Sequence, residues 1–168
     1  MILDSDVTPT GGGTITLSAT PGLLTSQITS DGFQLTNVDN VIQSQGNLGT
    51  NLTAIINQPG GLVNGNVNGQ VLIVDPINSP TGFVNHGLLE ATGGGLRQLS
   101  GGGGGGFINT GANMLANGAG SEVQFINSAR VTGGTLSAIN GGILHNLTGQ
   151  TAAWRSTRTH SLGGQPGF

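Results

Sequence analysis

A short motif, an apolar or threonine-containing pair followed by asparagine, recurs through most of this 168-residue chain. The asparagines are Asn37, Asn57, Asn85, Asn109 and Asn127, and the intervals between them are 20, 28, 24 and 18 residues. Repeats with a period of about 20–50 residues are typical of solenoids, in which each repeat packs only against its neighbours. We therefore expect a stack of irregular coils.

The residues between these asparagines read as short strands. Segments 14–17 and 70–74 are alternating or apolar runs, and Gly, Asn and Pro punctuate the chain around such runs. No segment keeps a helical period over about eleven residues without an interrupting glycine. Glycine and asparagine tolerate the positive φ angles of tight corners. The pattern predicts an all-β parallel solenoid with about six coils of roughly 18–28 residues and three short strands per coil.

The repeat divides the chain into three parts. We expect residues 14–150 to form the solenoid and residues 1–13 to be an N-terminal extension or cap. Residues 151–168 break the pattern and hold the only tryptophan, Trp154, and two of the four arginines. This segment is either a frayed tail or a cap that covers the edge strands of the last coil.

Composition excludes some classes of protein. Only 7% of the residues are charged, there is no lysine, and the formal net charge is -3. Low charge with recurring Val, Ile and Leu argues against intrinsic disorder, and the basic surface needed for nucleic acid is absent. No apolar run approaches the roughly 18 residues of a membrane span, so we expect no membrane insertion by this segment.

Three acidic residues are weak candidates for a carbohydrate-processing site. Enzymes of that kind use clustered carboxylates, and Asp39, Asp75 and Glu90 would cluster only if the coils aligned them. The interpretation that we favour is three separate, solvated carboxylates at corners. We therefore expect no catalysis.

No other motif predicts a cofactor or a metal. The run Gly101 to Gly106 lacks the strand-to-helix context of a phosphate-binding loop, and we interpret it as a corner loop. The histidines do not have ligand spacing, and no aspartate follows Asp75 to supply repeated calcium ligands. We expect neither a cofactor nor a metal ion.

The recurring asparagines allow two interpretations. If they are stacked in register, their amides form a ladder of hydrogen bonds along the solenoid axis. Alternatively, each residue independently occupies a left-handed corner conformation.

Segments 33–43, 70–76 and 83–96, together with Gly133-Gly134-Thr135-Leu136-Ser137, resemble the repeats of large bacterial surface proteins. The similarity, over residues 14 to 146, is to autotransporter passenger domains and filamentous-haemagglutinin-like adhesins. It implies a right-handed parallel β-helix at the cell surface or outside the cell. Residues 1–6 show no signal peptide, so we expect this chain to be a segment of a longer secreted protein.

These observations together predict a structural or adhesive segment that serves as a stalk or spacer. Its expected partners are glycans or a host cell surface. One alternative is a carbohydrate-binding or carbohydrate-processing β-helix. Another is a filament subunit that associates end to end through open solenoid ends, because unpaired strand edges invite pairing.

Overall fold

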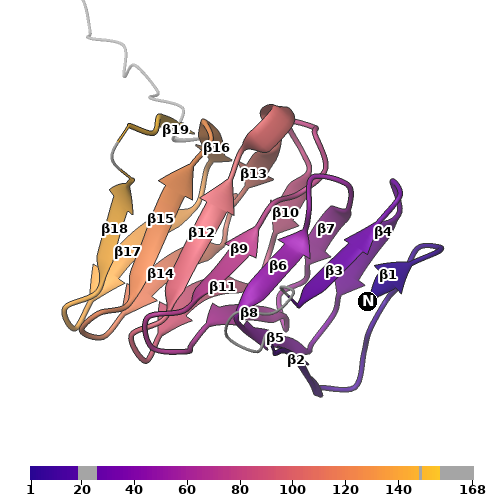
Figure 1. Cartoon of the computed structure of the whole chain (residues 1–168), viewed down its shortest axis with the longest axis horizontal. Helices are drawn as coiled ribbons and strands as arrows, with labels where there is room; N and C mark the ends of the chain where they lie inside the picture. Colours follow the sequence, from indigo (N-terminus) through magenta and orange to yellow (C-terminus); the bar gives the residue numbers. More distant parts are fainter. Residues whose placement is uncertain (19–25, 148, 156–168) are drawn as a thin grey trace, which may run out of the picture.

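The computed structural model describes residues 1–18, 26–147 and 149–155, and within them the chain is all-β. Three parallel sheets run side by side along one axis, from the N-terminal coil to the last strands (Figure 1). The described residues contain no α-helix, and the one helical turn is the short 3-10 helix η1 (Gly102–Gly104). The structure confirms the predicted parallel β-solenoid of about six coils.

The three sheets are named A, B and C in the order in which the chain visits them. Sheet A contains β1 (Ile2–Leu3), β3 (Gln27–Ser30), β6 (Gly46–Gly49), β9 (Val71–Val74), β12 (Leu96–Ser100), β15 (Glu122–Ile126) and β18 (Ile143–Asn146). Sheet B contains β4 (Gln34–Asn37), β7 (Ala54–Asn57), β10 (Phe83–Asn85), β13 (Gly106–Ile108), β16 (Ala129–Thr132) and β19 (Ala152–Arg155). Sheet C contains β2 (Thr14–Leu17), β5 (Val41–Ser44), β8 (Leu62–Gly65), β11 (Leu88–Thr92), β14 (Asn113–Asn117) and β17 (Thr135–Ile139).

Each strand pairs with the strand one coil before it and the strand one coil after it. Phe83, for example, lies opposite Ile55 on one side and Phe107 on the other, at separations of 28 and 24 residues. Consecutive strands in the sequence lie in different sheets, so the backbone hydrogen bonds of the ladders all join distant parts of the chain. This pairing satisfies the backbone groups of a chain that is too poor in large apolar residues to build a two-layer core.

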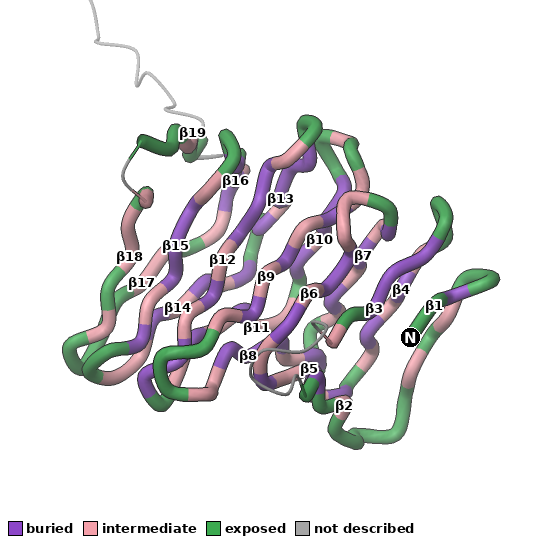
Figure 2. Tube along the Cα trace, viewed as in Figure 1, coloured by how far each residue is buried: buried purple, intermediate pink, exposed green. Residues whose placement is uncertain are grey.

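The core is a narrow column between the three sheets. It is built from the side chains that point inward, and these alternate with outward side chains along each strand, as the buried positions in Figure 2 indicate. In sheet B the column runs through Leu35, Ile55, Phe83 and Phe107, which are all buried. The Phe83 and Phe107 rings lie 5.7 Å apart between centroids. Complete burial of each such side chain stabilises the fold by about 1.5–3 kcal/mol. One inward side chain in every two residues of a strand is therefore enough to form a core.

Strand pairing extends beyond both of the boundaries expected from the sequence. β1 pairs with β3, and Val7 bridges to Leu35, so residues 1–13 belong to the first coil. β19 pairs with β16, so the solenoid continues at least to Arg155, and residues 156–168 lie outside the described part of the chain. These flanking strands pair by their backbones although they lack the asparagine motif on which the boundaries at 13 and 150 were based.

Apolar exposure rises on the last strand of every sheet. Ile139 in β17, Ile143 in β18 and Trp154 in β19 are each about half exposed. Trp154 lies opposite Val131 and donates its indole N–H to the carbonyl of Gly133 at 3.4 Å. Its ring continues the inward row of sheet B, so β19 extends the stack as a strand.

Candidate functional site

Four of the five recurring asparagines form a buried ladder at the corner between sheets B and C. Nδ2 of Asn37 donates to Oδ1 of Asn57 at 2.9 Å, Asn57 donates to Asn85 at 2.9 Å, and Asn85 donates to Asn109 at 2.8 Å. All four residues are completely buried. Of the two interpretations of the repeat, the structure therefore shows the ladder.

Three of the four ladder amides also close their own corner. Asn37 donates to the carbonyl of Asn40, and Asn57 donates to the carbonyl of Gly61, at 2.8 and 3.0 Å. Asn109 makes the equivalent bond to Ala112 at 3.3 Å. One side chain thus fixes the turn within a coil and the contact to the next coil, which explains why asparagine recurs at the period of the repeat.

Glycine beside the ladder makes this close approach possible. A Cβ on Gly61 would overlap Oδ1 of Asn57 and lie 2.7 Å from Nδ2 of Asn37. A Cβ on Gly87 would overlap two backbone carbonyl oxygens and lie 2.7 Å from Nδ2 of Asn57. Since these positions have no room for a side chain, the glycines that follow the asparagines are part of the same structural unit.

The fifth asparagine, Asn127, lies outside the ladder. It follows β15 of sheet A, whereas the residue opposite Asn109 in sheet B is Gly133, which follows the paired residues Ile108 and Thr132. Asn127 adopts a positive φ of 52° and donates to Oγ of Ser100 at 3.1 Å. Its assignment to the same repeat as the other four asparagines was wrong. The two residues before it, Phe125 and Ile126, match the motif, but they lie on a strand of sheet A and not of sheet B.

The structure does not bring the three candidate acidic residues together. Asp39 lies at a corner between sheets B and C, Asp75 follows β9 of sheet A, and Glu90 lies on β11 of sheet C. Burial raises the pKa of Asp75, and a hydrogen bond from Ser100 opposes that rise. This placement offers no pair of carboxylates for acid and base roles.

Arg97 occupies an inward position that apolar residues fill in the neighbouring coils. It lies opposite Leu72 and Val123 in sheet A and is completely buried. Its Nε donates to the carbonyl of Glu90 at 2.9 Å, but Nη1 and Nη2 have no hydrogen-bond partner among the described residues. Burial lowers the pKa of Arg97 to about 9, and the negative charge of Glu90 opposes this effect.

The Glu90 carboxylate is the counterpart of this buried cation. Burial raises the pKa of Glu90, and the charge of Arg97 opposes the rise. Oε1 of Glu90 accepts a hydrogen bond from Nδ2 of Asn64 at 3.0 Å. A buried charge is costly unless it is fully paired, so Arg97 is a polar intrusion into the core that sequence reasoning missed, and the half-buried Glu90 on β11 partly offsets its charge.

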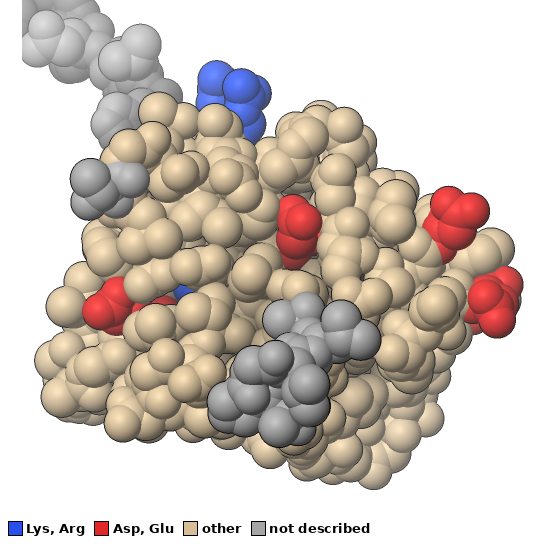
Figure 3. All heavy atoms as spheres, in the orientation of Figure 1, with Lys and Arg blue, Asp and Glu red and all other residues tan. Residues whose placement is uncertain are grey.

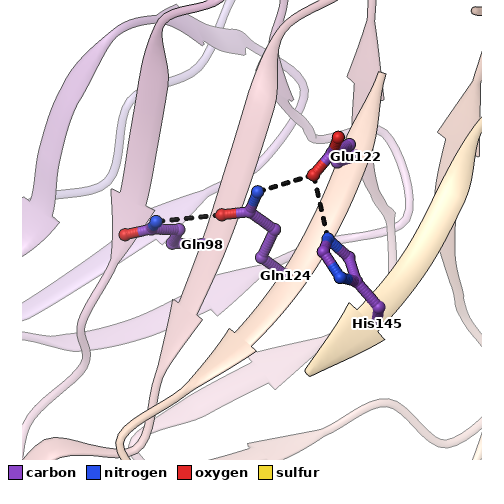
Figure 4. A network of polar contacts seen from close by, with 4 residues as sticks. All are labelled: Gln98, Glu122, Gln124 and His145. Carbon is purple, nitrogen blue, oxygen red and sulfur yellow. Dashed lines mark hydrogen bonds and ion pairs between the residues drawn. The ribbon is translucent and has the colours of Figure 1, made fainter. Parts of the chain in front are cut away.

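A second polar network lies on sheet A, where neighbouring strands carry Gln98, Gln124, Glu122 and His145 (Figure 4). Gln98 donates to Gln124 at 2.9 Å, and Gln124 donates to Oε2 of Glu122 at 2.6 Å. The same carboxylate oxygen lies 2.9 Å from Nε2 of His145. The hydrogen bond from Gln124, with a smaller contribution from His145, lowers the pKa of Glu122. These contacts join three coils.

A cavity of about 710 Å³ opens at the corner between sheets A and B and is called the corner hollow. Gly101, Gly103, Gly104 and Gly106 line one side, and the strands β16 and β19 contribute Arg130 and Arg155. Sequence reasoning did not single out these arginines. The only available signal was that two of the four cations are separated by about one coil length.

The described residues contain no group of three or more His, Cys, Asp or Glu side chains that could hold a metal ion. Within the same residues, no helix has the length and apolar character needed to cross a membrane. Comparisons with protein-family models, curated proteins and solved structures found no significant match to this chain.

Proposed function

We propose that this chain is a structural segment, a stalk or spacer, of a secreted bacterial surface protein. The observation that supports the proposal most directly is the unbroken parallel pairing of all three sheets, pinned at one corner by the buried asparagine ladder. Each coil is bonded to the next by backbone and by side chain, which makes a stiff element with a repeated outer surface. Resemblance of the repeats to bacterial surface proteins supports the proposed location.

The distribution of polar groups supports a structural role over an enzymatic one. The ladder amides are neutral, buried and fully engaged with each other and with corner carbonyls. Asp39, Asp75 and Glu90 lie in three different places, so a carbohydrate-processing reaction has no pair of carboxylates to carry it. This alternative therefore receives no support from the described residues.

The location is tested on intact cells of the source bacterium. Antibodies raised against the purified chain are applied before and after permeabilisation, and a periplasmic and a cytoplasmic protein serve as controls. Staining of intact cells is expected. Staining that appears only after permeabilisation of the inner membrane would overturn the surface assignment.

The mechanical role is tested by pulling on the chain from its two ends in single-molecule force spectroscopy. Because neighbouring coils are bonded to each other, unfolding is expected in steps of roughly one coil. A single cooperative rupture or featureless extension would contradict the proposed coil-by-coil spacer. Variants of Asn127, which lies outside the ladder, provide the matched control for variants of Asn57.

A further inference from the structure

The corner hollow results from unequal corner lengths between sheets A and B. The corner of one coil comprises residues 101–105, whereas the next comprises only Asn127 and Ser128. Both corners line the hollow, together with residues of β16 and β19. Gly101 allows the two corners to touch, because a Cβ there would lie 2.6 Å from the backbone N and Cα of Ala129.

Two arginines of neighbouring strands reach this hollow from the same face of sheet B. Thr132 lies opposite Arg155, so Arg130 and Arg155 are offset by two residues along adjacent strands. Strand spacing and rise place their Cα atoms roughly 8 Å apart. Figure 3 shows basic side chains grouped beside this corner, while acidic side chains lie elsewhere on the visible face.

Neither arginine is neutralised by another described residue. Among the described residues, no ion pair involves Arg130 or Arg155, and no residue that lines the hollow is acidic. The chain as a whole has a formal net charge of -3, so the positive charge at the hollow is opposite in sign to the net charge of the chain. Two exposed guanidinium groups with no carboxylate nearby favour a ligand that brings its own negative charges.

The remaining lining is neutral and mixed. Asn127, Ser128 and Thr132 contribute amide and hydroxyl groups, and the glycines with Pro80 and Val131 contribute C–H surface. A volume of about 710 Å³ is within the range of small-ligand sites. None of the described residues that line the hollow is aromatic, so they offer a nucleobase no ring on which to stack.

We propose that the corner hollow binds an acidic saccharide, with Arg130 and Arg155 each holding a carboxylate or sulfate group. Guanidinium forks match both kinds of oxyanion, while sugar hydroxyls match the hydroxyl and amide groups beside them. The binding site is a property of the chain itself, so it stands or falls independently of the spacer role proposed above.

The test measures binding to the purified chain by isothermal titration calorimetry at low and at physiological salt. The probes are an oligogalacturonide, which carries only carboxylates, an oligosaccharide of dextran sulfate, which carries only sulfates, and a neutral dextran oligosaccharide. Adenosine monophosphate is the fourth probe, for an anion without a saccharide polymer. Fluorescence of Trp154, the only tryptophan and a neighbour of Arg155, gives a second readout.

Three variants that change an arginine identify the site, and a fourth variant is the control. Arg130→Gln and Arg155→Gln are each expected to weaken binding by about tenfold, because each removes one charge-assisted contact. Arg155→Lys keeps the charge but loses the planar fork and is expected to restore only part of the affinity. The control Gln70→Glu changes the net charge by the same amount at an exposed position in a corner between sheets C and A, on a different edge of the solenoid, and is expected to stay within about twofold of wild type. Thermal unfolding followed by circular dichroism verifies that each variant is folded.

Preference for the oligogalacturonide assigns the ligand as a uronate saccharide, and preference for the sulfated oligosaccharide assigns a sulfated one. No detectable binding of either acidic saccharide would overturn the proposal. Equal loss of affinity in Gln70→Glu would also overturn it, since the attraction would then reflect net charge. Binding of adenosine monophosphate as tight as that of the best saccharide would show a general anion site instead.

Discussion

Nδ2 of Asn57 donates to Oδ1 of Asn85 at 2.9 Å, although 28 residues separate the two positions. The intervening residues complete one turn of the solenoid, including the longest of the described corners between sheets A and B, at residues 75–82. The ladder therefore holds neighbouring coils in register even where the corner lengths differ. It is the side-chain counterpart of the backbone pairing.

Replacing Asn57 with alanine is expected to destabilise the protein by about 2–4 kcal/mol. The change removes the donor to Oδ1 of Asn85 and to the carbonyl of Gly61, and both acceptors stay buried. Urea unfolding measures the loss. The control is Asn127→Gly, which removes an asparagine that lies outside the ladder and relieves a positive φ, and should cost below about 1 kcal/mol. Equal losses in the two variants would contradict a special role for the ladder.

Gly61→Ala is expected to destabilise the fold by about 1–3 kcal/mol. Its new methyl group would overlap Oδ1 of Asn57 and force the ladder apart. Gly13→Ala is the matched control, because a Cβ at that position would lie 3.5 Å from Oδ1 of Asn40, an ordinary contact. Thermal unfolding by circular dichroism compares the two. A similar shift in both midpoints would show that loss of glycine flexibility, and not overlap with the ladder, is the cause.

Arg97→Met is expected to leave the stability unchanged or to raise it at pH 7. The variant fills the same inward position with an apolar side chain and removes a buried cation whose Nη1 and Nη2 lack partners in the described residues. Glu90→Gln should destabilise, because Arg97 then stays buried without its counter-charge. A loss in Arg97→Met as large as in Glu90→Gln would contradict this assignment.

The difference in unfolding free energy by which Arg97→Met exceeds wild type should shrink as the pH rises above about 9. Burial lowers the pKa of Arg97 in the folded state to about 9, while in the unfolded chain the pKa keeps its much higher ordinary value. In that window unfolding takes up a proton, so wild-type stability rises with pH by at most about 1.4 kcal/mol per pH unit. The chain has no Lys, Tyr or Cys, so few other groups titrate there. Urea unfolding between pH 8 and 11 gives the two curves, and parallel curves would refute the effect.

Glu122→Gln is expected to cost about 0.5–1 kcal/mol near neutral pH. Hydrogen bonds from Gln124 and His145 lower the folded-state pKa of Glu122, so its contribution is complete above the ordinary value of 4.5 and is lost as the pH falls through the lowered pKa. The stabilities of wild type and variant should therefore converge once the pH has fallen below the lowered pKa of Glu122. Urea midpoints measured from pH 7 to pH 2.5 check this. Asp31→Asn, at an exposed position, controls for the loss of one negative charge.

The fold could be predicted from the sequence because the repeat consists of the residues that point into the core and the residues that form the corners. The motif ending in Asn37, Asn57, Asn85 and Asn109 follows the same sheet through four coils. The predicted register is wrong at the next coil, because Phe125-Ile126-Asn127 belongs to sheet A. The segment that continues the motif in sheet B is Val131-Thr132-Gly133. A two-residue corner separates these segments, and local composition does not reveal which sheet a short strand joins.

The candidate site could not be predicted in the same way. Arg97 and Glu90 are seven residues apart, and only the inward register of β12 shows that the cation is buried. The corner hollow depends on the difference between two corner lengths and on two arginines 25 residues apart, on neighbouring strands of sheet B. Both features arise from the stacking of coils, so they become visible once the register is known residue by residue.

The corners between sheets A and B vary from two residues, at 127–128, to eight, at 75–82, while the strands on both sides keep their pairing. Length at this corner is therefore uncoupled from the geometry of the column. The row is a natural place to graft peptides: an epitope inserted at 127–128 would be presented on a rigid support whose assembly does not depend on the guest sequence. Repeated along successive coils, such grafts would be presented at a spacing of about 4.8 Å per coil, or a multiple of it.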